Sequence, residues 1–199
     1  VLPELVSLGC LFVVSAVESL SDRTLAILDK GHTRADALEA FRLTREAGLT
    51  LRPSFVPFTP WETLDEHVAL LDFVVEEGLA GQIDPIQFAV RLLIPPRSLL
   101  LERPELRPHL GPLEPKALAY AWVHPDPRMD ALPRAVSLLI EEDASRGEDG
   151  WATVHRIRAL ASAARSGIPK AAWVETARSA QVPPQPAHRA PRLTEPWFC

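Results

Sequence analysis

The sequence predicts an α/β fold: the C-terminal half of a partial β/α barrel, followed by a helical appendage and a proline-rich tail. Three stretches with strand character, residues 11–17, 51–58 and 85–93, alternate with helical patterns. Strand–helix units in series are typical of parallel sheets with right-handed crossovers. Polar residues on one face of the strands favour a barrel-like sheet with a wet, ligand-holding interior. No GxGxxG motif follows the first strand, which disfavours a dinucleotide-binding fold.

The first unit carries the most informative stretch of the chain. Leu2–Leu8 has the pattern of a helix end, and Gly9 is a typical C-cap. Residues 11–17 form an apolar, β-branched run, which is typical of a buried strand. The next helical pattern covers 23–29. Between strand and helix lies a polar cluster made of Glu18, Ser19, Ser21 and Asp22.

This polar cluster is the first candidate site. In α/β folds, ligands bind where the carboxyl end of a strand meets the N-terminus of a helix. Glu18 supplies a carboxylate for a cation or an ammonium group, and the two serines supply hydroxyls for a sugar or a carboxylate. Asp22 is the natural N-cap of the next helix, so we assign it a structural role. The alternative is that the whole cluster only caps and satisfies a turn.

The second unit begins at Thr33, an N-cap whose capping-box partner is Asp36. Its helix ends at Gly48, and the strand over residues 51–58 follows. Because successive side chains of a strand point to opposite faces, alternation places three residues on one face of this strand: Arg52, Ser54 and Val56.

The third unit consists of a helix over residues 64–77 and a strand over residues 85–93. We interpret Thr63 as the helix N-cap and assign Glu62 a structural role beside it. Alternation in the strand places Gln87, Ala89 and Arg91 on one face. Arg91 is therefore expected to point into the barrel, where it would pair with a ligand carboxylate or, alternatively, with a core acid.

The pattern changes after Pro95-Pro96. Residues 103–127 read as a connection punctuated by prolines, and two helices are predicted over 130–144 and 150–165. From Gly167 onward, repeated prolines predict a mostly extended tail. We therefore divide the chain into a half-barrel, a helical appendage and a tail, with bounds 1–102, 103–166 and 167–199.

Composition excludes several classes of function. The chain has 199 residues and a formal net charge of -5, so it lacks the basic surface expected for nucleic-acid binding. No apolar run is long enough to span a membrane. Its two cysteines, Cys10 and Cys199, fit a reducing, cytoplasmic setting rather than a disulfide framework. Cys10 is interpreted as a small buried apolar residue, and the six histidines do not show metal-ligand spacing.

Five stretches follow one another along the chain: Ala16-Val17-Glu18-Ser19, residues 28–33, Ala47-Gly48-Leu49, residues 55–63 and Arg91 to Ser98. In this order they resemble the second half of a radical S-adenosylmethionine (radical SAM) core. The branch that the chain resembles has a fourth strand ending in Gly-Ile-Glu-Ser and a fifth strand leading into Gly-x-Pro-x-Glu-Thr, and Arg91 to Ser98 is similar to the sixth strand and its exit loop. The resemblance covers the chain up to about Leu101.

The end of the sequence adds to this resemblance. Glu195-Pro196-Trp197-Phe198-Cys199 is similar to the approach to the tail of radical SAM proteins that end in Cys-Cys-Ala-Glu-Pro or Cys-Sec-Ala-Glu-Pro. A selenocysteine codon after Cys199, translated as a stop, would account for the last residue. The chain also departs from the family. Ala16 and Phe58 replace glycines of the branch, and the first three strands and the Cys-x-x-x-Cys-x-x-Cys cluster motif are absent.

The resemblance implies a TIM-like barrel of the radical SAM type. It implies that Glu18, Ser19, Ser15 and Arg91 contact S-adenosylmethionine (SAM). The intact protein would use a 4Fe–4S cluster to cleave SAM reductively to a 5′-deoxyadenosyl radical. The cluster ligands would lie in the N-terminal half of the same protein, so we expect this chain alone to hold no cluster and to be inactive. The resemblance leaves the catalytic residues unidentified. It also does not identify the substrate, a small molecule or a peptide.

Two other functions stay open on the residues alone. One is a non-catalytic β/α barrel-type binding domain. The other is an ordinary barrel enzyme in which Glu18 acts as a carboxylate base.

Overall fold

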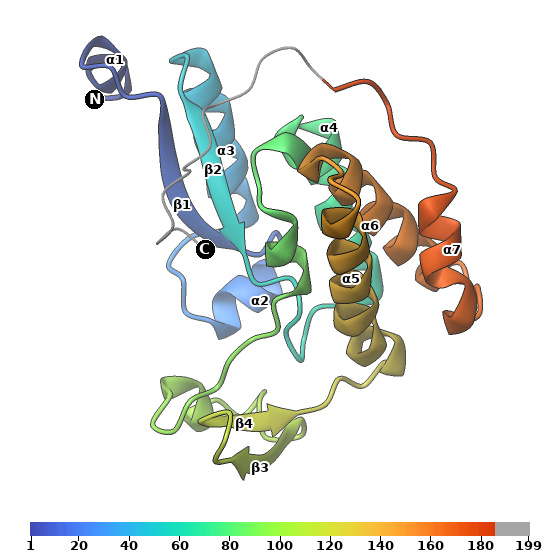
Figure 1. The fold of residues 1–199 in the computed structure, drawn as a ribbon. Coiled ribbons are helices and arrows are strands. Elements are labelled where there is room, and N and C mark those ends of the chain that lie inside the picture. Colours follow the sequence, from blue (N-terminus) through green and yellow to red (C-terminus); the bar gives the residue numbers. More distant parts are fainter. Residues whose placement is uncertain (186–199) are drawn as a thin grey trace.

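The computed structural model describes residues 1–185, and they form a mixed α/β structure with two small sheets (Figure 1). No closed barrel occurs in this part of the chain. The first sheet pairs β1 (Phe12–Glu18) with β2 (Thr50–Phe55) in parallel, as the sequence predicted. The helix α1 (Leu2–Ser7) precedes β1 and buries none of its residues.

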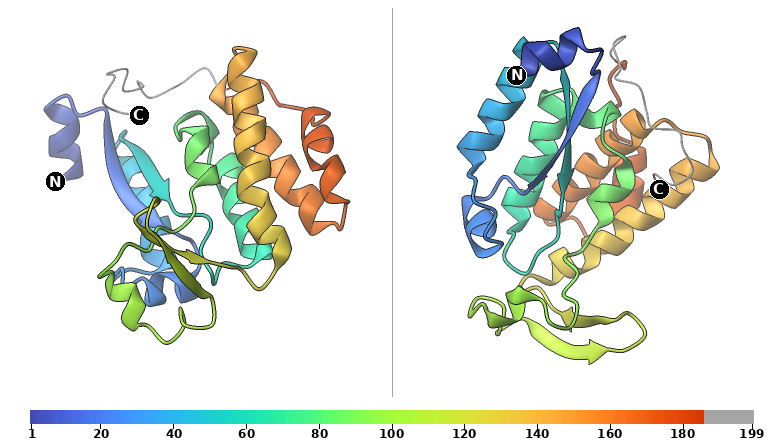
Figure 2. Two further views of the ribbon diagram at one scale, coloured as in Figure 1. Left: turned by 60° about the horizontal axis from the view of Figure 1, so that its bottom comes forward. Right: turned by 90° about the vertical axis from the view of Figure 1, so that its left-hand side faces the viewer.

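Two helices connect β1 to β2: α2 (Asp22–Ile27) and α3 (Arg34–Glu46). The predicted capping box at the start of α3 is confirmed: Thr33 accepts from the Asp36 backbone N–H, and Asp36 accepts from the Thr33 backbone N–H at 2.8 Å. The helix α3 covers one face of the strand pair (Figure 2). On the other side of the pair lie residues 79–89, with α5 beyond them.

The prediction of a third strand over residues 85–93 is wrong for most of its length. After α4 (Leu64–Glu76), the chain forms two short 3₁₀ helices, η1 (Leu79–Gly81) and η2 (Pro85–Ala89). Asp84 accepts from the Ile86 backbone N–H at 3.1 Å, and Pro85 takes the first helical position. An Asp-Pro pair therefore starts a helix here. One parallel bridge, between Phe58 and Arg91, is all that remains of the strand in the described residues.

The predicted connection over residues 103–127 contains a second sheet that the sequence analysis missed. It follows η3 (Leu99–Glu102) and is an antiparallel hairpin of β3 (Leu110–Glu114) and β4 (Ala119–Trp122). The hairpin lies beyond the carboxyl ends of β1 and β2 (Figure 1). Its Trp122 indole donates to the Leu92 carbonyl oxygen at 2.8 Å, which ties the hairpin to the main body.

The helical part is larger than predicted. The helices α5 (Pro127–Ser145) and α6 (Gly150–Arg165) pack on η2 and α4. Residues 170–178 are helical as η4 (Lys170–Ala172) and α7 (Trp173–Arg178), where an extended tail was predicted. One hydrophobic cluster includes residues from all three predicted segments, among them Val68, Leu139 and Trp173. None of the helices in the described part of the chain is both long and apolar enough to cross a membrane.

The strand β1 is expected to make the isolated chain self-associate. In the described residues it pairs with β2 alone, so its other edge presents unpaired backbone groups beside exposed apolar side chains. Val14 is 67% exposed and Leu11 is 59% exposed. Open, apolar edges invite pairing with a second chain. We expect oligomers by light scattering, and a smaller average mass for Val14→Lys. A monodisperse monomer of the unmodified chain would contradict this expectation.

Candidate functional site

A cavity of about 380 Å³ lies at the carboxyl ends of the parallel segments. Glu18 enters it from the end of β1, Val56 from the exit of β2 and Arg91 from the isolated bridge. This edge is where α/β sheets bind ligands, and it is the edge that the sequence predicted. Glu18, Lys30 and Arg91 are the charged residues of the wall. The rest of the wall is apolar: Leu28, Val56, Val90, Leu92, Leu93 and Leu100.

Glu18 lies in an unusual backbone turn. Its φ is 66°, in the left-handed region that a residue with a side chain rarely adopts. The Ser19 backbone N–H donates to the Val17 carbonyl oxygen at 2.8 Å, which closes a three-residue turn around Glu18. The Val56 N–H donates to the Glu18 carbonyl oxygen at 2.8 Å and fixes the turn to β2. Backbone strain of this kind is concentrated at functional sites.

Lys30 faces Glu18 across the cavity wall. Its Nζ lies 2.9 Å from the Glu18 Oε1. Both side chains are largely buried: that of Lys30 is 30% exposed and that of Glu18 is 19% exposed. The end of α2 positions Lys30: Asp29 has a φ of 56°, its N–H donates to Ala26, and the Lys30 N–H donates to Leu25. This pair of bonds is a Schellman motif. The sequence analysis did not single out Lys30.

Arg91 is the third charged residue of the cavity wall. Its guanidinium donates to the Asp130 carboxylate and to the Trp122 carbonyl oxygen, both at 3.0 Å. It also lies 3.9 Å above the centre of the Trp122 ring, a cation–π contact. Of the two partners considered for Arg91, the structure contains the acid, Asp130. This acid lies on α5, and the side chain of Arg91 is still 32% exposed.

Two of the predicted site residues do not line this cavity. Ser19 is 1% exposed, and its hydroxyl donates to the Glu62 carboxylate at 3.0 Å. Ser15 pairs with Pro53 of β2, and by strand alternation it shares the face of Val13 and Val17 rather than that of Glu18. The structure therefore brings Glu18 and Arg91 together and directs Ser19 and Ser15 elsewhere.

Glu62 connects the loop after β2 to the loop after β1. Its carboxylate accepts from the Thr24 hydroxyl at 2.9 Å and from the Ser19 hydroxyl, while the side chain is buried. Burial raises the pKa of Glu62 to about 7, with a smaller contribution in the same direction from the Glu66 charge; the hydroxyl bonds act in the opposite direction. The Ser19 Oγ accepts from the Ser21 backbone N–H at 2.9 Å. Glu62 therefore holds the segment that follows Glu18.

The assignment of Asp22 as N-cap of α2 is wrong. Ser21 is the N-cap and accepts from the Thr24 backbone N–H, while its own hydroxyl donates to Glu66 at 2.6 Å. Asp22 is the first residue of α2 and accepts instead from the Arg34 N–H at 2.6 Å, at the start of α3. Sequence rules fit both residues, because serine and aspartate are about equally good N-caps.

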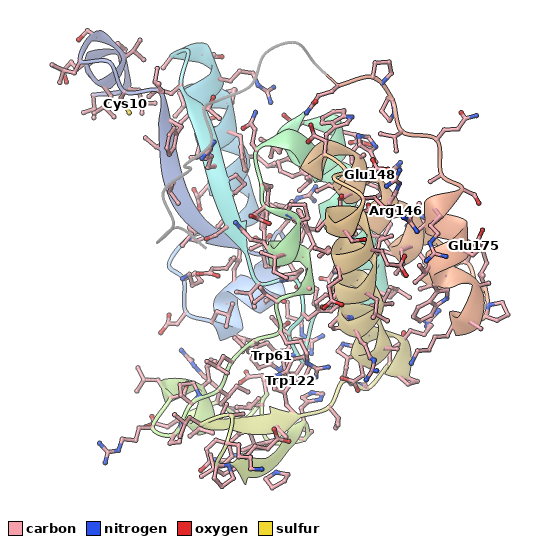
Figure 3. The ribbon with its side chains drawn as sticks, in the orientation of Figure 1. Cys10, Trp61, Trp122, Arg146, Glu148 and Glu175 are labelled. Carbon is pink, nitrogen blue, oxygen red and sulfur yellow. The ribbon has the colours of Figure 1, made fainter. Side chains whose placement is uncertain are left out.

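No group of three or more histidine, cysteine or acidic side chains that could hold a metal ion occurs in residues 1–185. Cys10 lies next to α1, at the amino end of β1 and so at the opposite end of the strand from Glu18 (Figure 3). It is partly buried, and its thiol donates to the Phe12 carbonyl oxygen at 3.3 Å. Cys199 and the tail motif lie outside the described residues.

Comparisons of this chain with models of protein families, with curated proteins and with solved structures find no match. The arrangement itself supports one kind of chemistry. The Glu18 carboxylate and the Lys30 ammonium group lie side by side, Arg91 also lines the cavity, and apolar side chains complete the wall. Such a site suits a zwitterionic molecule with an apolar body, because each end of the ligand finds an opposite charge.

Proposed function

We propose that this chain is the SAM-binding and substrate half of a radical SAM enzyme. The observation that carries the proposal is the cavity at the carboxyl ends of the parallel segments, with Glu18 and Arg91 in its wall. The order of the sequence motifs that end in Glu18-Ser19 and in Glu62-Thr63 supports it. In this proposal β1, β2 and the bridge at Arg91 correspond to the fourth, fifth and sixth strands of a partial TIM-like barrel, with the earlier strands in the N-terminal half of the protein.

The residues of the cavity fit the amino-acid end of SAM. Glu18 would accept from the ammonium group, and Lys30 would donate to the carboxylate. Arg91 adds a second positively charged residue to the wall. Leu28, Val56 and Leu100 would exclude water from the rest of the molecule. When bound in an intact enzyme of this class, SAM supplies a 5′-deoxyadenosyl group as the hydrogen-abstracting radical.

A 4Fe–4S cluster, in contrast, does not fit the residues of this chain. Clusters of this type are held by several cysteine thiolates. The chain has two cysteines, and Cys10 lies at the end of β1 that is remote from Glu18. The cluster would have to be held by the N-terminal half of the protein. We therefore propose that the chain alone binds SAM without cleaving it.

The ion pair with Lys30 favours a binding role for Glu18 over a role as a general base. The ammonium group lies 2.9 Å from the carboxylate and occupies the position from which a substrate proton would be removed. Incoming SAM would share or displace this contact through its own ammonium group. The non-catalytic binding domain differs from our proposal only in whether the completed protein turns SAM over.

Replacing Glu18 by glutamine is expected to weaken SAM binding about tenfold or more. The variant keeps the shape of the side chain and loses one charge-assisted hydrogen bond, worth about 1.5–3 kcal/mol. Calorimetric titration of SAM into the 199-residue chain measures the effect. Glu105→Gln, on an exposed acid outside the cavity, is the matched control and should bind SAM as the unmodified chain does.

Methylthioadenosine, which lacks the amino-acid end, separates the two ends of the ligand. Its affinity should be the same for the unmodified chain and Glu18→Gln. An unchanged affinity for SAM, or a large drop in melting temperature with the affinity intact, would assign Glu18 to a structural ion pair.

A further inference from the structure

The charged residues around the Glu18 cavity form pairs of opposite charge. In the wall, the Lys30 ammonium group lies 2.9 Å from the Glu18 carboxylate. The third charged residue of the wall, Arg91, lies 3.0 Å from the Asp130 carboxylate. Asp130 does not itself line the cavity, so the wall alone carries two positive charges and one negative charge. With Asp130 included, the four charges cancel.

Two hydrogen bonds hold Asp130 in its place beside Arg91. Asp130 lies in the first turn of α5, and each of its carboxylate oxygens has a donor. Oδ1 accepts from the Arg91 Nη2 and Oδ2 accepts from the His124 backbone N–H, each at 3.0 Å. A carboxylate fixed by two donors keeps its negative charge at a constant position relative to the cavity wall.

Arg91 has further contacts that keep it beside Asp130. Its guanidinium donates to the Trp122 carbonyl oxygen at 3.0 Å and lies 3.9 Å above the centre of the Trp122 ring. Turning away toward Glu18 would break these contacts as well as the bond to Asp130. Arg91 therefore keeps its positive charge at this part of the wall, and Asp130 is the acid that compensates it.

This compensation matters because of the charge of SAM. The molecule carries an ammonium group, a carboxylate and a sulfonium group, so its net charge is positive. In the proposed function, Glu18 and Lys30 match the first two groups. The sulfonium charge then meets whatever net charge the rest of the site has, and an uncompensated Arg91 would repel it. Like charges oppose binding more strongly in a partly buried site than in bulk water.

We propose that Asp130 is a positioning residue that sets the charge specificity of the cavity. By compensating the Arg91 charge, it lets the cavity accept a ligand with a net positive charge. This inference rests on the function proposed above. Asp130 acts through Arg91 and does not touch the ligand, so its contribution concerns charge rather than shape. Without it, the cavity would favour ligands that are neutral or negative.

S-adenosylhomocysteine provides the matched ligand for a test. It lacks the methyl group of SAM and with it the sulfonium charge, but it keeps the amino-acid end, the ribose and the adenine. Calorimetric titration of each ligand into the 199-residue chain gives the ratio of the two affinities. A substitution that merely loosens the cavity affects both ligands alike and leaves this ratio unchanged. A change in the ratio between variants therefore reports the charge of the cavity.

Asp130→Asn is expected to lower the ratio of SAM affinity to S-adenosylhomocysteine affinity about threefold or more, the order of magnitude for one unit charge near a partly exposed site. Asparagine has nearly the shape of aspartate but no charge, so Arg91 becomes uncompensated. The side chain of Asp130 is 29% exposed and that of Arg91 is 32% exposed, so solvent screens part of the effect.

Arg91→Gln should shift the ratio in the opposite direction. It removes the positive charge and leaves the Asp130 carboxylate uncompensated, which favours the cationic ligand. In the double variant, Asp130→Asn with Arg91→Gln, neither charge is present, and the ratio should return to that of the unmodified chain. Lost packing does not produce this pattern, because it would weaken both ligands in all three variants.

Glu141→Gln is the matched control. Glu141 is an exposed acid on the same helix as Asp130, eleven residues further on, or about 16 Å along the helix axis. Its substitution changes the net charge of the chain by the same amount. The separation exceeds the distance of about 8–10 Å over which exposed charges interact at ordinary salt concentrations. The ratio should therefore stay unchanged.

The possible results separate this inference from the proposed function. A lower ratio for Asp130→Asn and a higher ratio for Arg91→Gln would support it. An unchanged ratio for Asp130→Asn, with both ligands bound or with both affinities reduced by the same factor, would make Asp130 a structural residue and leave the proposed function intact. If neither ligand binds to the unmodified chain, the function proposed for the cavity fails, and the role of Asp130 fails with it.

Discussion

Replacing Trp173 by alanine is expected to lower the free energy of unfolding by about 3–5 kcal/mol. The indole ring is 2% exposed, and its N–H donates to the Ile168 carbonyl oxygen at 2.7 Å. It belongs to the same hydrophobic cluster as Leu160 and Ala164 of α6. Truncation would therefore create a cavity in the main core and leave a carbonyl group without its donor.

Urea denaturation followed by circular dichroism measures this loss. Leu138→Ala serves as the control, because Leu138 also lies on a helix but is 45% exposed; we expect it to cost less than about 1 kcal/mol. If the chain beyond Gly167 were a solvated tail, the two substitutions would have equally small effects. A clear difference places α7 in the cooperative core.

The same region shows why the helical residues 170–178 were not predicted. Prolines after Gly167 suggested an extended chain, but Pro169 directly precedes η4, where a proline is compatible with helix initiation. The better signal was the spacing of Trp173 and Ala177, four residues apart and both buried on one side of α7. The prolines indicate an extended chain more strongly than this short periodicity indicates a helix, because a helix of one or two turns has little periodicity to show.

The strands were predicted with the same partial success. Residues 11–17 and 51–58 gave β1 and β2 because each has a run of apolar or alternating side chains. Residues 85–93 alternate equally well, yet Asp84 and Pro85 start a 3₁₀ helix, and only Arg91 forms a bridge, with Phe58 beyond the end of β2. Local capping chemistry therefore overrides alternation at this point. The hairpin of β3 and β4 was not predicted, because prolines interrupt residues 103–127.

At the candidate site, sequence reasoning found the residues on strands and missed the residue on a turn. The polar cluster at the end of the first predicted strand contains Glu18, and alternation in the stretch before Pro95 indicated Arg91. Lys30 depends on the left-handed backbone of Asp29, a tertiary arrangement that propensities do not encode. The sequence indicates a helix end at Asp29-Lys30-Gly31, but it does not indicate that Lys30 contacts Glu18. Glu62 was assigned a structural role, which its bonds to Ser19 and Thr24 support.

Replacing Glu62 by glutamine is expected to stabilise the chain at alkaline pH. The Glu62 pKa of about 7 in the folded chain lies above its ordinary value of 4.5. The folded state therefore holds the proton more tightly than the unfolded state does. The stability gained from this proton is fully present below about pH 4.5 and is lost as the pH rises through about 7. The loss amounts to about 3 kcal/mol, on the order of 1.4 kcal/mol for each pKa unit.

Histidines make the raw pH dependence of stability unsuitable as a test. Burial lowers the pKa of His67 to about 4 from 6.5, so its proton is bound more tightly by the unfolded chain. Its contribution rises with pH between about 4 and 6.5, which opposes the contribution of Glu62. Burial also lowers the pKa of His155. The difference between the unmodified chain and Glu62→Gln removes both histidine contributions, because they are common to the two proteins.

The decisive quantity is the change of this difference with pH. A glutamine carries no charge at either pH, and its amide can still accept from the Thr24 hydroxyl and bond to Ser19, so the loops after β1 and β2 stay joined. Urea denaturation at pH 5 and pH 8 should show that the gain from Glu62→Gln is about 2–3 kcal/mol larger at pH 8. Glu105→Gln, on an exposed acid, should show no such dependence.

A gain that is equal at the two pH values would mean that Glu62 binds its proton equally in the folded and unfolded chains. The bonds from Ser19 and Thr24 would then offset its burial, and the turn that carries Glu18 would be insensitive to pH.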